Sequence, residues 1–448
     1  MIGQWVERRC LSSSVLRQWY LDHYVSIKHI EKQIPRRLGW LAPPSSVTLV
    51  ITYACNYICD HCHSASHPKA EWGLPFETIA RLIREMREMG TKHLSITGGE
   101  PLVRDDLFDI LDLANHEGLR IQLVTNGSLV EQQRERLAKT DLDCVFTSVD
   151  GLEETNDRFR HHPGAFKQAF RAIELFHEMG VRHRLVNTMV HPGNLQELEA
   201  LGDRIMASAA TSWRIALALP SGRARGQDRF YLSDEQIRWV LRFIEDRRES
   251  FDVFLSERVG YVGPWALKVR SRPFASSEGL SNIGILPSGD VVGSCVVHDL
   301  IYSEGNVKRQ SLREIWRTGF QRYRQPVLPD ACYECRHLHA CGGGTLGMRV
   351  GDRHCLNHLW EEGGKTHESS RHEKPEAAVH EADADEAQAS AGYHSVQGES
   401  YGLEKKEGLG FEAGPVRSGI LMYRTHGSRK DRLHRVARRQ DKGGQHAL

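Results

Sequence analysis

Residues 51–66 read ITYACNYICDHCHSAS and place three cysteines, spaced C-x3-C-x2-C, directly after an apolar, β-branched run. These cysteines are Cys55, Cys59 and Cys62. Three thiolates on one short loop can hold three corners of a metal centre and leave the fourth corner to another ligand. A structural zinc site normally closes with four ligands, and His61 or His63 could complete one, so zinc stays an alternative on spacing alone.

Composition limits the classes of protein that this chain can belong to. Its 448 residues suffice for two or three domains with a sizeable core. Lys and Arg number 59 against 58 Asp and Glu, so no charge excess favours a nucleic-acid or membrane partner. No apolar run could span a bilayer, and the N-terminus lacks a secretory signal. We therefore expect a cytoplasmic protein, in which clustered thiols indicate metal or redox chemistry.

From Ser45 onward, short strand patterns alternate with helical patterns. Strands are predicted near 47–53, 92–97, 120–125, 143–149, 183–190 and 212–219. Helices are predicted near 76–89, 105–117, 130–139, 164–179, 194–208 and 233–250. Strand–helix units in series predict a parallel sheet, either open or curled into a partial barrel. Ligands of such sheets bind at the carboxyl ends of the strands, where the cysteine loop would then lie.

The chain divides into four predicted regions. Residues 1–43 form a helical extension, 44–264 the strand–helix series, 265–360 a small metal-stapled domain, and 361–448 a tail of disordered composition. The third region carries a second cysteine group, made of Cys332, Cys335, Cys341 and Cys355. The remaining cysteines, which are Cys10, Cys144 and Cys295, stand alone in the sequence.

Three motifs at successive strand ends carry a resemblance to a known family. They are the C-x3-C-x2-C loop, Gly98-Gly99-Glu100-Pro101 and Thr125-Asn126-Gly127. Over roughly residues 45–225 the chain resembles the radical S-adenosylmethionine (SAM) superfamily. The resemblance implies an α/β fold, with a partial (β/α)6 barrel of parallel strands and a small C-terminal Fe–S domain. It also implies that the three loop cysteines hold a [4Fe–4S] cluster whose open iron binds SAM.

The resemblance further implies a set of SAM-binding residues at the strand ends: Gly98, Gly99, Glu100, Asn126, Ser148, Asp150, Arg160 and Asn187. The two glycines would let the backbone approach the methionine end of SAM. Glu100 would accept a hydrogen bond from its amino group, and Arg160 would pair with its carboxylate. Ser148 and Asp150 stand where the family contacts the ribose, and His61 could lie near the adenine. Strand-end turns without a ligand explain Asn126 and Asn187 equally well.

The second cysteine group, C-x2-C-x5-C followed by Cys355, resembles the SPASM extension of many peptide-modifying radical SAM enzymes. Four thiolates can complete one auxiliary [4Fe–4S] cluster with no open iron, although a zinc ribbon uses the same ligands. The full extension holds two clusters, but Cys295 is the single cysteine left for the other one and Thr345 replaces a further cysteine. We therefore expect one auxiliary cluster. Cys295 could be a packed thiol, an extra ligand or a group facing the substrate.

The resemblance implies an enzyme that cleaves SAM reductively to a 5′-deoxyadenosyl radical, which abstracts hydrogen from a substrate. The SPASM-like run favours a peptide or protein that is cross-linked, oxidised or epimerised, with an electron donor such as flavodoxin or ferredoxin. The alternative is an enzyme that matures a tetrapyrrole, haem or another small-molecule cofactor. A hypothesis from another class is a non-catalytic zinc or Fe–S binding interaction protein. The sequence assigns no catalytic acid or base.

Overall fold

The computed structural model describes residues 41–70, 72–272, 274–295, 300–328, 330–349, 355–356 and 358–361. Three predictions fall largely outside these residues. They are the helical extension at 1–43, of which 41–43 are described, the thiol of Cys10, and the disordered tail beyond Glu361. Among the described residues, no helix is long and apolar enough to cross a membrane.

The six predicted strands are all present. They are β1 (Ser46–Val50), β2 (His93–Thr97), β3 (Arg120–Thr125), β4 (Cys144–Ser148), β5 (His183–Val190) and β6 (Ser212–Leu217). Each pairs in parallel with the next along the chain. A seventh parallel strand that the sequence did not reveal, β7 (Val253–Leu255), pairs with β6. Its three residues are too few to show an alternating pattern.

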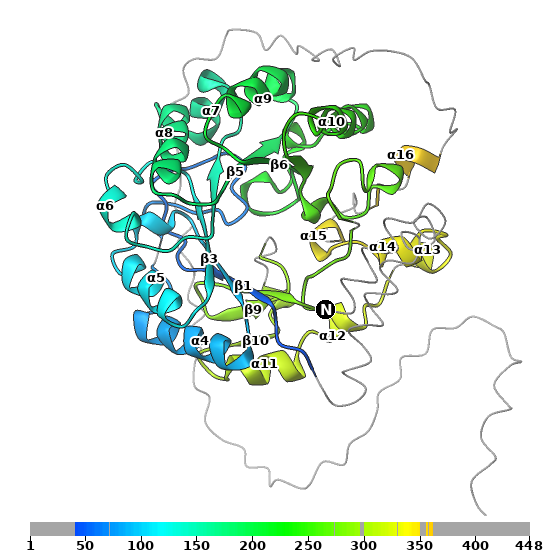
Figure 1. Ribbon diagram of the computed structural model, residues 1–448. Helices are drawn as coiled ribbons and strands as arrows, with labels where there is room; N and C mark the ends of the chain where they lie inside the picture. Colours follow the sequence, from blue (N-terminus) through cyan, green and yellow to red (C-terminus); the bar gives the residue numbers. More distant parts are fainter. Residues whose placement is uncertain are drawn as a thin grey trace, which may run out of the picture. The chain divides into compact units, whose positions relative to one another are not determined.

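The helices connect the strands and cover one face of the curved sheet (Figure 1). The predicted ones are α4 (Phe76–Met89), α5 (Leu107–His116), α6 (Arg134–Leu137), α8 (Ala165–Glu178), α9 (Leu198–Met206) and α10 (Asp234–Arg247). An unpredicted helix, α7 (Glu153–Arg160), follows β4. Helix α4 ends as expected at Gly90, whose φ of 94° is left-handed and whose N–H bonds the carbonyls of Met86 and Arg87.

The C-terminal region extends the same sheet instead of building a separate one. Strand β8 (Asn282–Ile285) pairs in parallel with β1, and β9 (Asp290–Val292) and β10 (Gly305–Asn306) continue antiparallel. The result is one ten-stranded sheet in the order β10-β9-β8-β1-β2-β3-β4-β5-β6-β7. This pairing covers the edge of β1 that would otherwise expose unpaired backbone groups. The division at residues 264 and 265 remains a prediction.

Short helices follow the last strand. They are α11 (Leu312–Thr318), α12 (Gln321–Arg324), α13 (Asp330–Tyr333), α14 (Leu338–Cys341), α15 (Leu346–Arg349) and α16 (His358–Glu361). The second cysteine group lies on and between these helices. Hydrogen bonds tie this segment to the rest of the fold, because Leu346 N donates to Glu278 Oε2 at 2.7 Å and Thr345 Oγ1 donates to the carbonyl of Arg258 at 3.0 Å.

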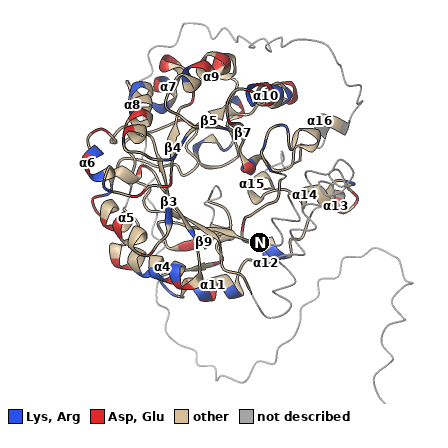
Figure 2. Ribbon diagram, viewed as in Figure 1, with Lys and Arg blue, Asp and Glu red and all other residues tan. Residues whose placement is uncertain are grey.

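The two faces of the sheet differ in polarity. Outward side chains such as Val47, Leu94 and Ile121 are fully buried in an apolar core beneath the helices. The alternate side chains on the other face, including Ser95 and Gln122, line a cavity. Figure 2 shows that acidic and basic residues lie mainly on the surrounding helices, with both signs interspersed. The period-2 alternation of the strands therefore builds a polar-lined interior inside an apolar wall.

Candidate active site

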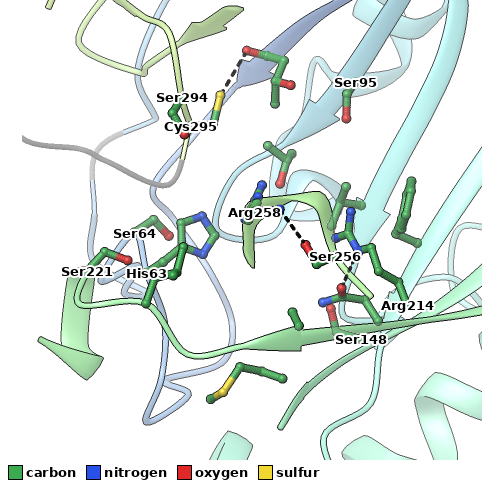
Figure 3. Close-up of a pocket in the computed structure, with 18 of the residues that line it drawn as sticks. His63, Ser64, Ser95, Ser148, Arg214, Ser221, Ser256, Arg258, Ser294 and Cys295 are labelled. Atoms are coloured by element: carbon green, nitrogen blue, oxygen red, sulfur yellow. Dashed lines mark hydrogen bonds between the residues drawn. The ribbon is translucent and has the colours of Figure 1, made fainter. Parts of the chain in front are cut away.

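A cavity of about 590 Å³ lies against the polar face of the sheet. Its wall combines the cysteine loop, side chains of strands β1 to β6, the 274–278 segment and residues 293–295, part of which appears in Figure 3. Cys55, Cys59 and Cys62 all line it. The predicted position of the cysteine loop at the carboxyl ends of the strands is therefore confirmed.

One buried arginine that no sequence motif indicated fixes both ends of the segment 51–74, which contains the cysteine loop. Arg104 donates from Nη1 to the carbonyl of Ile51 at 2.7 Å and from Nη2 to that of Leu74 at 2.7 Å. A third bond, of 3.0 Å, runs to the carbonyl of Trp72. Because a single guanidinium satisfies carbonyls at the start and the end of this segment, the two ends are held together.

The loop thiols of Cys55 and Cys59 are held protonated by their surroundings. Burial raises the pKa of Cys55 to about 12, with Glu100 adding to the effect, and burial raises the pKa of Cys59 to about 11. Without a bound cation these groups stay protonated, whereas a coordinated metal ion removes the proton outright. No three described His, Cys, Asp or Glu side chains converge to hold one ion. The thiolates of a cubane bind different irons and need no such convergence.

Gly98 and Gly99 are required by the cysteine loop itself. A Cβ on Gly99 would lie 2.1 Å from the carbonyl oxygen of Ala54, and a Cβ on Gly98 would lie 2.6 Å from that of Thr52. The close approach allows Gly99 N to donate to Thr52 O at 2.8 Å and Glu100 N to Ala54 O at 2.9 Å. The family resemblance places these glycines near the methionine end of SAM. The structure gives them an additional role, which is to dock the loop on the end of β2.

We expect Gly99→Ala to displace the cysteine loop, because the new methyl group overlaps backbone rather than a movable side chain. Iron bound by the anaerobically reconstituted protein should fall by about half, as one of two [4Fe–4S] sites is lost. The control is Gly118→Ala, a glycine of φ +73° with nothing within 4 Å of an added Cβ. It should lose stability of about 1 kcal/mol and keep its iron. Equal iron loss in both variants would contradict this role of Gly99.

Glu100 is fully buried and joins two strand ends. Its Oε1 accepts hydrogen bonds from Leu102 N at 3.1 Å and Thr125 Oγ1 at 2.9 Å, and its Oε2 accepts from Asn126 N at 2.7 Å. Burial raises the pKa of the carboxyl to about 7 despite these bonds. Glu100 does not itself line the cavity, whereas Gly98, Gly99 and Asn126 do. Its contact with the amino group of SAM stays a prediction.

Asp150 and Arg160 form a buried ion pair beneath the cavity. Arg160 Nη2 lies 2.5 Å from Asp150 Oδ2, and Asp150 Oδ1 accepts from Met189 N at 2.8 Å. Burial alone would raise the pKa of Asp150, but Arg160 and the neighbouring groups hold it below its usual range. Arg160 also lines the cavity, and its buried Nε has no partner among the described residues. The pair thus positions a cation at the cavity wall.

His61 stacks flat on Phe159, with ring centroids 4.6 Å apart, and Phe159 stacks on His191 at 4.3 Å. Burial lowers the pKa of His61 to about 4, so the ring is neutral at physiological pH. His61 lines the cavity. A neutral ring held parallel to its neighbour is suited to stack on a planar group, which agrees with the predicted place near adenine.

Three further predicted residues also reach the cavity, which are Asn126, Ser148 and Asn187. Asn126 donates from Nδ2 to Asn56 Oδ1 at 2.8 Å, so it braces the cysteine loop as well. Asn187 Oδ1 accepts a bond of 2.8 Å from Arg214 Nε. The cavity therefore gathers most of the residues predicted from the sequence, while Glu100 and Asp150 support it from behind.

Arg223 lies in the segment after β6 and hydrogen-bonds to the cysteine loop. No sequence motif indicated this residue. Its Nε donates to Cys59 O at 2.7 Å, its Nη1 to Ser66 O at 2.9 Å, and its backbone N to Cys62 O at 3.0 Å. The preceding Gly222 would place a Cβ 2.2 Å from Cys62 O. Gly222 is the one sequence feature here that is typical of a close backbone approach. The contact itself could not be predicted, because Arg223 and the cysteine loop are some 160 residues apart in the sequence.

The auxiliary cysteines gather apart from the loop. Burial raises the pKa of Cys341 to about 11, and Cys355 and Cys332 lie near enough to add to the effect. Cys335 N donates to Cys332 O at 3.3 Å, so these two residues share one turn of the backbone. Cys295 lines the main cavity instead, with its Sγ 3.9 Å from Thr48 O. Of its three predicted roles, the cavity position agrees best with a group facing the substrate.

Two family profiles match the chain. One, described as the radical SAM superfamily, matches residues 49–205, and one described as an iron–sulfur cluster-binding (SPASM) domain matches residues 277–336. The first contains the cysteine loop and every predicted SAM contact, and the second begins at the segment that lines the cavity. It includes Cys332 and Cys335, whereas Cys341 and Cys355 lie beyond it.

Curated relatives of two kinds are similar to the chain. The AdoMet-dependent heme synthase of Oleidesulfovibrio alaskensis is 30% identical over 316 residues, which cover 65% of this chain and 80% of the relative. The mycofactocin maturase MftC of Mycolicibacterium smegmatis is 28% identical, covering 72% of this chain and 83% of the relative.

Solved structures share the fold. SuiB of Streptococcus suis bound to the precursor peptide SuiA has a TM-score of 0.58 at 16% identity, covering 74% of this chain and 79% of that one. The structure of anSMEcpe with bound AdoMet has a TM-score of 0.55 at 18% identity, covering 68% of this chain and 90% of that one. At these identities the likeness shows a shared fold alone.

Proposed function

The chain belongs to the radical SAM superfamily, and from this premise we propose that it modifies a peptide or protein by hydrogen abstraction. It is a radical SAM enzyme with a SPASM-like extension, and its cofactors are a [4Fe–4S] cluster, SAM and an auxiliary cluster. The cluster supplies, when bound, the electron that cleaves SAM. The single observation that carries hydrogen abstraction from a bound substrate is that the cysteine loop and the polar face of the sheet line one cavity.

The residues around this cavity have distinct proposed tasks. Cys55, Cys59 and Cys62 hold the cluster at one side, and Arg223 and Arg104 keep their loop in place. Arg160 would bind the carboxylate of SAM and His61 would stack on its adenine, between that loop and the strand ends. The substrate occupies the remaining depth of the cavity, where the strand side chains position the carbon that loses hydrogen. The enclosing wall keeps water away from the reactive radical.

The peptide assignment rests on the SPASM-like extension and on the maturase relatives. A second candidate, maturation of a tetrapyrrole, is favoured by the similarity to AdoMet-dependent heme synthases. Both candidates use the same hydrogen abstraction and differ in what fills the cavity. Under either one, Thr345 brings the auxiliary segment to the cavity wall, since it lines the cavity four residues after Cys341.

Deuterium transfer separates the two candidates. The reconstituted holoenzyme is incubated with SAM, dithionite and a perdeuterated substrate, and the 5′-deoxyadenosine is analysed by mass spectrometry. The substrates compared are a short peptide encoded beside the gene and iron coproporphyrin III. We expect deuterium in the 5′-deoxyadenosine with the peptide. Transfer from the porphyrin alone would replace the peptide assignment by the second candidate, and unlabelled 5′-deoxyadenosine with both would contradict each of them.

A further inference from the structure

Two arginines that no sequence motif identified lie in the depth of the cavity. Arg214 is the third residue of β6, and Arg258 belongs to the 3-10 turn Glu257–Val259 that follows β7. Both line the cavity, and Figure 3 draws them on two different segments of its wall. The carbonyl of Arg258 accepts a hydrogen bond from Thr345, so the segment that carries it is anchored to the auxiliary region.

The positive charge of these two arginines is poorly compensated by the protein. Arg214 donates from Nε to the neutral amide of Asn187 and lies over the ring of Phe146, 4.6 Å from its centroid. Among the described residues, the ion pairs involve other arginines, such as Arg160 with Asp150 and Arg247 with Glu199. Burial lowers the pKa of Arg214 to about 9, and repulsion from Arg258 adds to this effect. The pKa of Arg258 is also lowered by burial.

Acidic groups stand near the pair without contacting it at ion-pair distance. Glu257 acts on Arg214, and Glu278 acts on Arg258 only at longer range. One oxygen of Glu278 is already engaged by Leu346 N. Both arginines are half-buried in the cavity wall, where two neighbouring cations repel each other, and an anionic ligand in the cavity is placed to neutralise them.

We propose that Arg214 and Arg258 form a subsite that binds a carboxylate of the substrate. This inference rests on the proposed function and deepens it, because it states the chemical class of the substrate. A guanidinium is planar and binds carboxylates through two parallel hydrogen bonds, and Arg214 is already held in one orientation by Asn187 and Phe146. The Phe146 face and the Asn187 amide leave the guanidinium edge of Arg214 for the ligand.

The subsite differs in place from the proposed SAM site. Arg160, the predicted partner of the SAM carboxylate, is influenced by Cys59 of the cluster loop. Arg214 is in register with Asn187, which is itself in register with Ser148, so the backbone of Arg214 lies level with these two predicted SAM contacts. Its guanidinium, however, lies over the ring of Phe146, which precedes Ser148 by two residues on β4, and so reaches away from the carboxyl end of the sheet where the cysteine loop lies. A carboxylate bound there would belong to the substrate.

Two sources can supply such a carboxylate, and the experiment distinguishes them. One is a peptide, through its C-terminus or an acidic side chain, and the other is the propionate groups of a porphyrin. In the first arm, equilibrium dialysis measures binding of iron coproporphyrin III and of its tetramethyl ester to the anaerobic holoenzyme. In the second arm, a random hexapeptide library is retained on immobilised holoenzyme, once with free C-termini and once amidated. The variants are Arg258→Gln and Arg214→Gln, and the charge-matched control is Arg84→Gln on the exposed face of α4.

In one of the two arms, we expect the ligand with free carboxylates to bind at least about tenfold more tightly than its ester or amide. Each cavity variant should bind that ligand at least about tenfold more weakly than the wild type does. Arg84→Gln should bind like the wild type. Arg258→Gln and Arg84→Gln should bind radiolabelled SAM with unchanged affinity and form 5′-deoxyadenosine at the wild-type rate in the absence of substrate. If neither arm prefers the acid, or if Arg258→Gln loses SAM binding instead, the subsite is refuted. Because ligand binding requires no SAM cleavage, this failure is distinguishable from failure of the proposed function.

Discussion

Replacing Cys59 by alanine should remove the SAM-cleaving cluster and leave the auxiliary cluster in place. Cys59 is one of three thiols on the loop, and two thiolates cannot hold a cubane that already lacks a fourth protein ligand. Iron in the anaerobically reconstituted protein should fall from about eight to about four per chain. Formation of 5′-deoxyadenosine should fall to background, because no other site presents an open iron. Iron analysis and chromatography of the nucleoside products measure both quantities.

The matched control for this variant is Cys144→Ala. Cys144 is a buried thiol at the start of β4 and does not line the cavity. Its loss should cost about 1 kcal/mol of stability through a small void and leave iron and SAM cleavage unchanged. A Cys59→Ala protein that keeps about eight irons would contradict the assignment of the loop. A Cys144→Ala protein that loses about four would do the same.

The second large effect is expected for Asp150→Asn. Its carboxylate is 1% exposed and pairs with Arg160, so the substitution leaves a buried guanidinium without its counter-charge. Breaking a buried ion pair from one side typically costs about 3–5 kcal/mol. Urea unfolding of the reconstituted protein, followed by circular dichroism, should show a loss of this size. SAM binding should weaken as well, because Arg160 is then free to leave the cavity wall.

The comparison for Asp150 is Asp203→Asn. Asp203 pairs with Arg247 at 2.7 Å, but its side chain is 67% exposed. Exposed pairs contribute at most about 1 kcal/mol, since water and salt screen them. If the two aspartate variants lost equal stability, the buried pair would not be the structural support that its geometry indicates.

The sequence predicted the architecture well where patterns are local. The six strands of the series and the helix Phe76–Met89 follow from alternation, a 3.6-residue period and a glycine stop. Two features were missed, which are strand β7 and the pairing of β8 with β1. Strand β7 has only three residues, and β8 joins β1 from more than 200 residues away, so neither position in the sheet leaves a local signal in the sequence.

The position of the cysteine loop in the candidate site was predictable from the sequence, whereas the residues that support this loop were not. Cysteine spacing placed the loop at the cavity, but spacing could not show that the cysteine loop itself occupies the space beside Gly99. Arg104 and Arg223 act on backbone carbonyls, which carry no sequence signature. Arg214 could have been noticed in the sequence, because it is a charged residue between two apolar ones in the strand pattern Trp213-Arg214-Ile215. A cation on the polar face of a barrel strand indicates a group that faces the interior.

The most direct test of the central assignment is SAM cleavage by the wild-type holoenzyme. The anaerobically reconstituted full chain is mixed with SAM and dithionite, and 5′-deoxyadenosine and methionine are quantified over time. We expect both products in equal amounts from the wild type, and neither from Cys59→Ala. A fully reconstituted wild-type protein, containing about eight irons per chain, that forms no 5′-deoxyadenosine would contradict the account.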